Sequence, residues 1–304
     1  MAATDAAGNG RAWAVLALVF NAFTWGVSWW PFRQLADVGL HPLWLTGIIY
    51  TTAAVGLLIA RPAALPEVLR TPALWALVLA SGATNACFNW GVSIGDVVRV
   101  VLLFYLMPLW TVVLSRLLLG ERVSARGAGR VALSLAGAMV VLWPGDSAVA
   151  AAVVLPGRLP NWLPDALGLL GGLAFALNNV MLRREARRSP EARAFAMFAG
   201  GAVVSMVLAA LLTQTSLATA PPPLAWGWGL AALGMTAWFL VSNLALQYGA
   251  ARLPANTTSL IMITEVFFAS ASALAMGAGT LGWREGLGAS MILGGALLAS
   301  VQKD

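Results

Sequence analysis

The sequence predicts an all-α integral membrane protein whose ten transmembrane helices form two inverted five-helix repeats. Of the 304 residues, 60% are hydrophobic and only 10% are charged. Average soluble domains carry about 25% charged residues, so this chain has too few to cover a water-exposed surface. Its apolar residues also fall into uncharged runs of about the length that crosses a bilayer. Arginines mark the ends of many of these runs, which is typical of a multi-pass membrane protein.

The first apolar run, residues 12–32, follows Arg11. It is longer than the hydrophobic region of a signal peptide and has no clear cleavage site, so we expect an uncleaved first span. The remaining runs of the first group are residues 43–60, 72–92, 100–118 and 127–143.

A segment rich in proline and glycine, residues 144–164, interrupts this pattern. Its apolar part, residues 148–155, is too short to cross a membrane, so we expect a loop that joins repeat 1–143 to repeat 165–304. The second group of runs is residues 165–182, 194–212, 224–248, 256–276 and 285–301.

The positive charges test this topology. Five spans per copy would place the two copies in opposite orientations across the membrane. With the N-terminus inside, fourteen of the 18 lysines and arginines fall on the cytoplasmic side and four on the other. This bias favours a multi-pass membrane protein with both termini cytoplasmic and the 144–164 loop external. The family resemblance described below implies that this membrane is the bacterial inner (plasma) membrane.

Residues 100–121 contain a proline within an apolar helix, Pro108. Proline removes a backbone donor, which a packed membrane bundle tolerates, so we expect a helix kinked at a cavity. When Pro108 is set against Val266, residues 103–107 (Leu-Phe-Tyr-Leu-Met) align with residues 261–265 (Ile-Met-Ile-Thr-Glu), which indicates a duplication.

With Tyr-Leu-Met-Pro-Leu-Trp at residues 105–110, Leu-Leu-Leu-Gly-Glu-Arg at 117–122 and Thr-Glu-Val-Phe-Phe at 264–268, the chain resembles the drug/metabolite transporter superfamily. Within it, the sequence is most similar to the EamA family and its bacterial exporters of aromatic and neutral amino acids. The resemblance implies a secondary transporter that exports neutral amino acids with apolar or aromatic side chains by alternating access through a central cavity. The alternative is efflux of cationic drugs or other small metabolites, with Glu265 as the counter-ion.

Polar residues inside the apolar runs are the candidates for substrate binding. Asn85 and Asn89 stand one helical turn apart, so their amides share a face and could hold a carboxylate or an ammonium group. Asn178 and Asn179 lie centrally in their run, where at most one of the two can face a cavity squarely. Hydrogen bonding between helices is the alternative role for these asparagines.

Aromatic residues deep within the runs, Trp25, Tyr105 and Trp238, could favour an apolar side chain through stacking, although packing in the bundle is the alternative. Glu265 is an acidic residue well inside an apolar run, which is costly unless it is paired or faces water. We expect Glu265 and Pro108 to act in gating or coupling, and a bracing role for Glu265 is favoured over proton transfer.

Other classes of function lack the necessary residues. The single histidine, His41, and the single cysteine, Cys87, supply neither a metal cluster nor a nucleophile with its base. No phosphate-binding loop of the Walker type is present. We therefore expect no enzyme activity, no cofactor, no metal and no nucleic-acid partner. The expected partners are a small-molecule substrate and membrane lipid, and small residues such as Gly137 and Gly288 suit seams of a bundle or a homodimer, so the protein is either a monomer or a homodimer.

Overall fold

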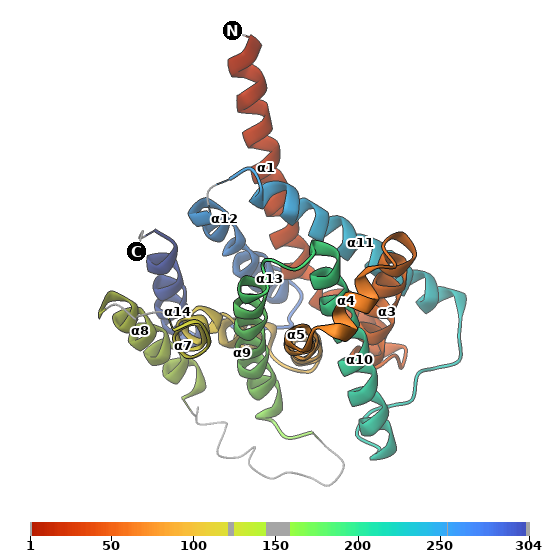
Figure 1. Cartoon of the computed structure of the whole chain (residues 1–304). Helices are drawn as coiled ribbons and strands as arrows, with labels where there is room; N and C mark the ends of the chain where they lie inside the picture. The colour runs from red at the N-terminus through yellow and green to blue at the C-terminus, as the bar shows by residue number, and fades with distance from the viewer. Residues whose placement is uncertain (1, 121–124, 144–158, 254, 302–304) are drawn as a thin grey trace.

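The computed structural model describes residues 2–120, 125–143, 159–253 and 255–301, and within these ranges it is helical without a strand (Figure 1). The all-α class is therefore confirmed. Residues 121–124 and most of the expected connecting loop, residues 144–158, lie outside the described residues. The helices are α1 (Ala2–Val27), α2 (Trp29–Asp37), α3 (Pro42–Ala60), α4 (Ala64–Arg70), α5 (Pro72–Ile94), α6 (Val97–Phe104), α7 (Met107–Leu119), α8 (Ala125–Leu142), α9 (Leu163–Arg184), α10 (Pro190–Gln214), α11 (Trp226–Ala250), α12 (Ala255–Met262), α13 (Thr264–Ala275) and α14 (Trp283–Val301).

Each apolar run predicted from the sequence coincides with one of these helices or with two in succession. The protein is a multi-pass membrane protein, because several described helices are long and apolar enough to cross a bilayer. Six segments meet that standard: Ala12–Asp37, Pro42–Ala60, Val97–Leu119, Leu163–Arg184, Pro190–Gln214 and Trp226–Ala250. The short helix α4 was not predicted.

Two apolar segments are interrupted at corresponding places. Between α6 and α7 the helix breaks at Tyr105 and Leu106, and Pro108 lies in the first turn of α7, where its missing N–H needs no partner. The position predicted for the kink is therefore correct. Between α12 and α13 the break falls at Ile263 without a proline, and the Thr264 hydroxyl donates to the carbonyl oxygen of Ile261 at 2.6 Å. A third interruption, at Ser28 between α1 and α2, was not predicted.

Helix α5 lies between α9 and α10 and packs on both (Figure 1). Helix α10 also packs on α3, α1 on α11 and α13, α9 on α6 and α7, and α8 on α14. Small residues allow the closest approaches. A Cβ on Gly82 would clash with the Gly200 carbonyl oxygen, and one on Gly200 would clash with the Val78 carbonyl oxygen. Gly137 and Gly288 likewise meet across α8 and α14, so this glycine pair forms a seam within the bundle.

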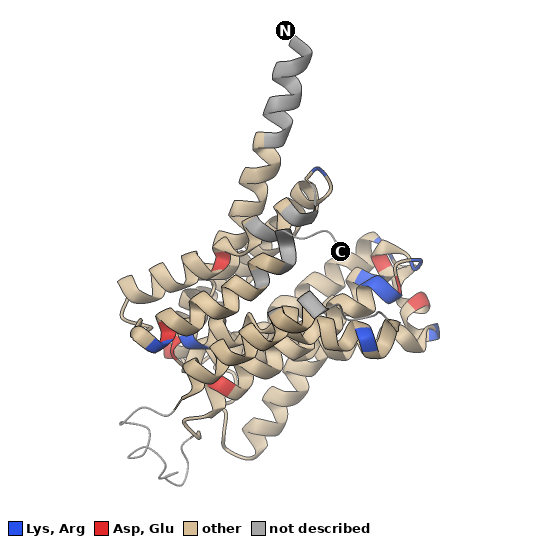
Figure 2. Ribbon diagram, turned by 90° about the vertical axis from the view of Figure 1, so that its left-hand side faces the viewer, with Lys and Arg blue, Asp and Glu red and all other residues tan. Residues whose placement is uncertain are grey.

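Most charged residues gather on two opposite sides of the bundle, with uncharged helix between them (Figure 2). At one side, which we call the Asp165 end, Arg99 donates from Nε and Nη2 to the two carboxylate oxygens of Asp165, each at 2.8 Å. There the Asp96 carboxylate also accepts from the Thr280 amide at 2.7 Å and from its hydroxyl at 2.9 Å, which ties α6 to the segment before α14.

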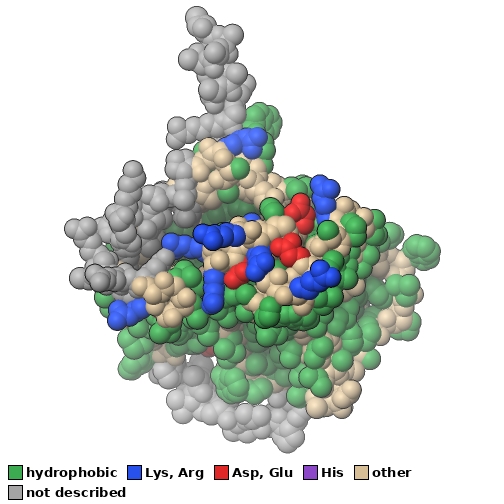
Figure 3. Space-filling view, viewed as in Figure 1, with side chains coloured by type: hydrophobic (Ala, Val, Ile, Leu, Met, Phe, Trp, Pro, Cys, Tyr) green, Lys and Arg blue, Asp and Glu red, His purple; other side chains and the backbone are tan. Residues whose placement is uncertain are grey.

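The other side, which we call the arginine-rich end, carries the charged side chains that face the viewer in Figure 3. The largest group of them comes from α4, the end of α9, the start of α10 and the segments next to these helices. Glu67 of α4 accepts from the Ser189 hydroxyl at 2.6 Å and from the Ser189 amide at 3.2 Å. These hydrogen bonds hold the pKa of the Glu67 carboxyl below its usual value. The side chains that form this surface are Arg61, Glu67, Arg70, Arg183, Arg184, Glu185, Arg187, Arg188, Glu191 and Arg193.

Replacing Glu67 with glutamine is expected to lower the melting temperature at pH 7 by a few degrees. The folded-state pKa of Glu67 lies below the unfolded value of about 4.3, so the stabilisation is present above that pH and is lost as the pH falls through the folded-state pKa. Because the pair is partly exposed, its contribution is about 1 kcal/mol or less. Thermal melts of purified protein between pH 7 and pH 3.5 should show the parent and Glu67→Gln converging, and a difference that does not change with pH would contradict this assignment.

Candidate functional site

The two interrupted helices meet at Tyr105 and Glu265. Tyr105 ends α6 with its side chain buried, and Glu265 lies in the first turn of α13. The Tyr105 hydroxyl is 3.0 Å from Glu265 Oε2 and 3.2 Å from the carbonyl oxygen of Met262, at the end of α12. It has one hydrogen, which it can donate to either acceptor. The contact therefore joins the break in α6 and α7 to the break in α12 and α13.

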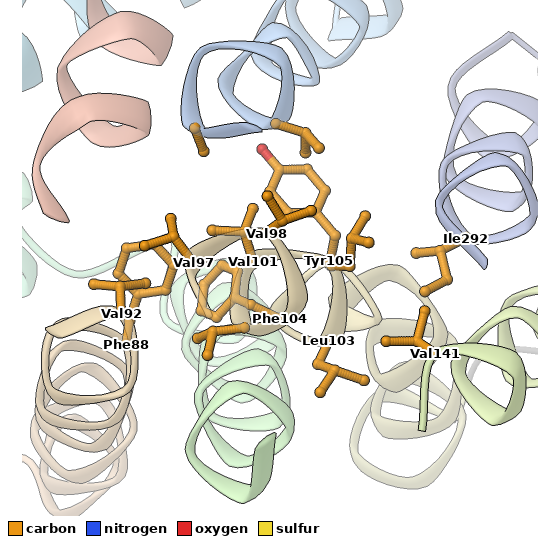
Figure 4. Close-up of a cluster of buried hydrophobic side chains, with 14 of the residues drawn as sticks. Phe88, Val92, Val97, Val98, Val101, Leu103, Phe104, Tyr105, Val141 and Ile292 are labelled. Carbon is orange, nitrogen blue, oxygen red and sulfur yellow. The ribbon is translucent and has the colours of Figure 1, made fainter. Parts of the chain in front are cut away.

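Tyr105 also borders an apolar cluster, and Figure 4 shows its hydroxyl pointing away from Phe104 and Phe88. Phe104 packs on Phe88 of α5 and on Phe175 of α9, with ring centroids 4.8 Å and 5.5 Å apart. The Phe104 and Tyr105 rings are 6.3 Å apart. One side of the junction is therefore aromatic and dry, whereas the other carries the Glu265 carboxylate.

Helix α1 lies against this junction. A Cβ on Gly26 would come within 2.8 Å of the Glu265 carbonyl oxygen and 2.7 Å of the Phe268 Cβ. Trp25, the preceding residue, stacks on Phe239 of α11 with ring centroids 4.9 Å apart and planes 9° apart. The Trp238 ring lies parallel to Phe239 as well, with centroids 5.9 Å apart. Trp25 and Trp238 therefore belong to one aromatic stack, which Phe239 completes.

Asn85 and Asn89 both bond to α3. The Tyr50 hydroxyl donates to Asn85 Oδ1, and Asn85 Nδ2 donates to the carbonyl oxygen of Ser81 at 2.8 Å. Asn89 Nδ2 donates to Thr46 Oγ1 at 3.1 Å. Hydrogen bonding between helices, which the sequence indicated as the alternative role of these asparagines, is thus present for both residues. Asn89 Oδ1, however, is buried without a hydrogen-bond partner.

Asn178 and Asn179 differ in exposure. Asn178 is 2% exposed, and its Oδ1 atom has no hydrogen-bond partner. Asn179, its neighbour on α9, is exposed. A buried acceptor without a donor is costly unless something else supplies the hydrogen bond. Asn178 is therefore the member of the pair whose amide oxygen is buried and still lacks a hydrogen-bond donor.

Two hollows flank these elements. A groove of about 430 Å³ between α1 and α11 is lined by Trp13, Leu16, Ala17, Phe20 and Tyr248, and its surface is almost entirely apolar. A cavity of about 380 Å³ at the Asp165 end is polar and includes Arg33 and Asp37 of α2 and Ser93 of α5. Arg33 is one of the four basic residues that the predicted topology places on the external side, and no sequence motif indicates a site there. Among the described residues, no group of three His, Cys, Asp or Glu side chains could hold a metal ion.

Comparisons with known proteins agree with this architecture. The model of the EamA-like transporter family matches residues 12–143, so this part of the chain is similar to the family that the sequence motifs predicted. Thirteen chains of solved structures match. One, described only as "Crystal structure of protein", has a TM-score of 0.53 and 19% identity over 94% of this chain and 96% of its own, which supports the fold alone. No curated protein matches the sequence.

Proposed function

We propose that this protein is a secondary transporter that exports neutral amino acids with apolar or aromatic side chains by alternating access. The observation that carries the proposal is the junction of the two interrupted helices at Tyr105 and Glu265, beside the aromatic stack of Trp25, Trp238 and Phe239. Interrupted helices expose backbone groups and side chains to a substrate in the middle of a membrane bundle. Stacked rings suit an apolar or aromatic side chain.

The proposed architecture is ten spans in two inverted repeats, residues 1–143 and 165–304, joined by an external loop at 144–164. The pattern of helix contacts supports it. Helix α1 packs on α11 and α13, and its counterpart α9 packs on α5 and on α6 and α7. In the proposed repeats α3 is the counterpart of α10, α5 of α11 and α8 of α14. The contact of α5 with α10 therefore corresponds to that of α11 with α3, while the α3–α10 and α8–α14 contacts each join a helix to its own counterpart. Exchanging the two halves therefore preserves these main contacts, although the contact of α3 with α5 has no counterpart of similar size between α10 and α11.

The charge distribution supports an orientation in which the arginine-rich end and both termini are cytoplasmic. Arg61, Arg70 and Arg183 to Arg193 lie at the arginine-rich end, whereas Arg33, Arg99 and Arg284 lie towards the Asp165 end. Basic residues are retained on the cytoplasmic side of membrane proteins. We place the protein in the bacterial inner membrane on this basis and on its family resemblance.

Among the described residues, three buried amide oxygens lack a hydrogen-bond partner, on Asn21, Asn89 and Asn178, and those of Asn89 and Asn178 are the proposed contacts for the substrate ammonium group. Asn85 is placed one turn from Asn89, where it positions α5 against α3. Pro108 is assigned to the break that exposes the junction, and Glu265 to bracing it. Asn179 has an exposed side chain and is left out of the proposed contacts.

Reconstituted protein is expected to accumulate labelled L-phenylalanine in liposomes, and Asn178→Ala is expected to raise the concentration for half-maximal transport at least tenfold. A hydrogen bond to a charged group contributes about 1.5 to 3 kcal/mol, and 1.4 kcal/mol corresponds to tenfold in affinity. Asn179→Ala is the matched control, because it removes an exposed amide from the adjacent position.

If Asn178→Ala and Asn179→Ala changed the concentration for half-maximal transport equally, Asn178 would not be a substrate contact. Transport of a lipophilic cation such as tetraphenylphosphonium, without transport of L-phenylalanine, would instead favour the alternative of cationic efflux. In that case the Glu265 carboxylate would be the counter-ion.

A further inference from the structure

The cavity at the Asp165 end carries one cation and one anion on the same helix. Arg33 and Asp37 are four residues apart on α2, so they are neighbours on its surface. The Asp96 and Asp37 carboxylates both act electrostatically on the Arg33 guanidinium, but neither forms a hydrogen-bonded ion pair with it. Arg33 is held from behind, because Nε and Nη2 donate to the carbonyl oxygen of Val92 at 3.1 and 3.0 Å, and Nη2 also donates to that of Gly95. These bonds leave the Nη1 hydrogens for another partner.

Apolar surface lies beside these charges. Trp29 and Trp30 line the same cavity, and the Arg33 guanidinium lies 5.2 Å from the centroid of the Trp29 ring. Trp29 is itself fixed, because its Nε1 donates to Ser272 Oγ of α13 at 3.0 Å. Trp30 is 47% exposed. The cavity thus combines a guanidinium held in place, a nearby carboxylate and the exposed ring of Trp30, with the nearly buried Trp29 at its edge.

This cavity and the aromatic stack lie along the same helical face. Trp25, Trp29 and Arg33 follow one another at intervals of four residues, which places them along one face of α1 and α2. The face begins at the aromatic stack next to the Tyr105 and Glu265 junction and ends at the cavity. A molecule that leaves the junction towards the Asp165 end would pass along these side chains.

We propose that this cavity is a second binding site for a zwitterionic α-amino acid, distinct from the junction. Arg33 binds the carboxylate, Asp37 binds the ammonium group, and the two tryptophans cover the side chain. A ligand with only one charge would leave either Asp37 or Arg33 without a partner. The identity of the ligand rests on the proposed function, whereas the site rests on the cavity and its charges.

The test uses protection of a cysteine inside the cavity. Ser93 lines it, and Ser93→Cys is a small change that can be made in a Cys87→Ala background, so that the introduced thiol is the only one. In lipid nanodiscs, L-phenylalanine is expected to slow modification of this thiol by a water-soluble reagent. Phenylacetate and phenethylamine, which each lack one charge, should need at least tenfold higher concentrations for the same protection.

Arg33→Gln and Asp37→Asn are each expected to raise the half-protecting concentration of L-phenylalanine at least tenfold. Arg284→Gln is the matched control, because Arg284 lies towards the same end but does not line the cavity. The comparison of the three ligands uses the protein that carries only Ser93→Cys and Cys87→Ala. It therefore tests the proposed site even if Arg33→Gln fails to fold.

The outcomes separate this site from the proposed function. Absence of protection in a protein that transports L-phenylalanine would overturn this site alone. The site would also be overturned if phenethylamine and phenylacetate protected the thiol at the same concentrations as L-phenylalanine. Protection by L-phenylalanine that is unchanged in Arg33→Gln and in Asp37→Asn would overturn it as well. Protection that depends on Arg33 and Asp37 in a protein that does not transport L-phenylalanine would support the site and refute the proposed function.

Discussion

Replacing Gly200 with alanine is expected to destabilise the folded bundle by about 3 kcal/mol or more, at the upper end of the usual cost of overpacking. The added Cβ would clash with the carbonyl oxygen of Val78, lie 2.8 Å from its carbonyl carbon and lie 3.1 Å from the Gly82 amide nitrogen. These are backbone atoms, which cannot move aside as a side chain can. Thermal unfolding in detergent, followed by size-exclusion chromatography, should show loss of the folded species.

Gly56→Ala on α3 is the matched control, because a Cβ there meets nothing within 4 Å. Alanine is favoured over glycine inside a helix by about 1 kcal/mol, so this variant should melt at or above the parent temperature. Equal stability of Gly200→Ala and Gly56→Ala would mean that α5 and α10 do not approach each other so closely.

Glu265→Ala is expected to destabilise the protein by about 1 to 3 kcal/mol, because the Tyr105 hydroxyl loses its carboxylate acceptor inside the bundle. The carbonyl oxygen of Met262 remains as a second acceptor, which places the expected cost near the lower bound. Glu265→Gln keeps an oxygen acceptor and should melt close to the parent. A double-mutant cycle with Tyr105→Phe should show a coupling of 0.5 kcal/mol or more, and strict additivity would contradict the contact.

Transport distinguishes bracing from proton coupling at the same residue. If Glu265 braces the junction, Glu265→Gln should transport L-phenylalanine with the same response to a pH gradient as the parent. A variant that exchanges substrate normally but no longer follows the gradient, in the same liposome preparation, would instead identify Glu265 as the proton carrier.

The positions of the helices follow largely from local sequence. Uncharged runs predict where α3, α5 and α9 lie, because crossing a bilayer requires a minimum length of apolar chain. Pro108 predicts the break before α7, since proline lacks a backbone donor. The break at Ser28 has no comparable signal, because a serine in an apolar run is compatible with a continuous helix. Helix α4 is short and lies between spans, where hydropathy is uninformative.

The candidate site depends on contacts between distant parts of the chain. Tyr105 and Glu265 could each be selected as unusual residues inside an apolar run, but their contact joins positions 160 residues apart. The sequence could not show which of Asn178 and Asn179 is buried, because the two residues are adjacent and share their local sequence. They differ only in whether their side of α9 packs against other helices. Arg33 looked like an ordinary charge at the end of a span until the cavity beside it was known.

The contact of Gly26 with the Glu265 backbone links two segments mechanically. Gly26 leaves no room for a side chain of α1 against α13 at this point, and the Trp29 indole fixes the start of α2 to α13 one turn further on. Because Ser28, between α1 and α2, keeps helical backbone angles, a tilt of α13 would swing α1 and α2 together as a lever. Arg33, at the far arm of that lever, would then be displaced from the Val92 and Gly95 carbonyl oxygens whenever the junction rearranges.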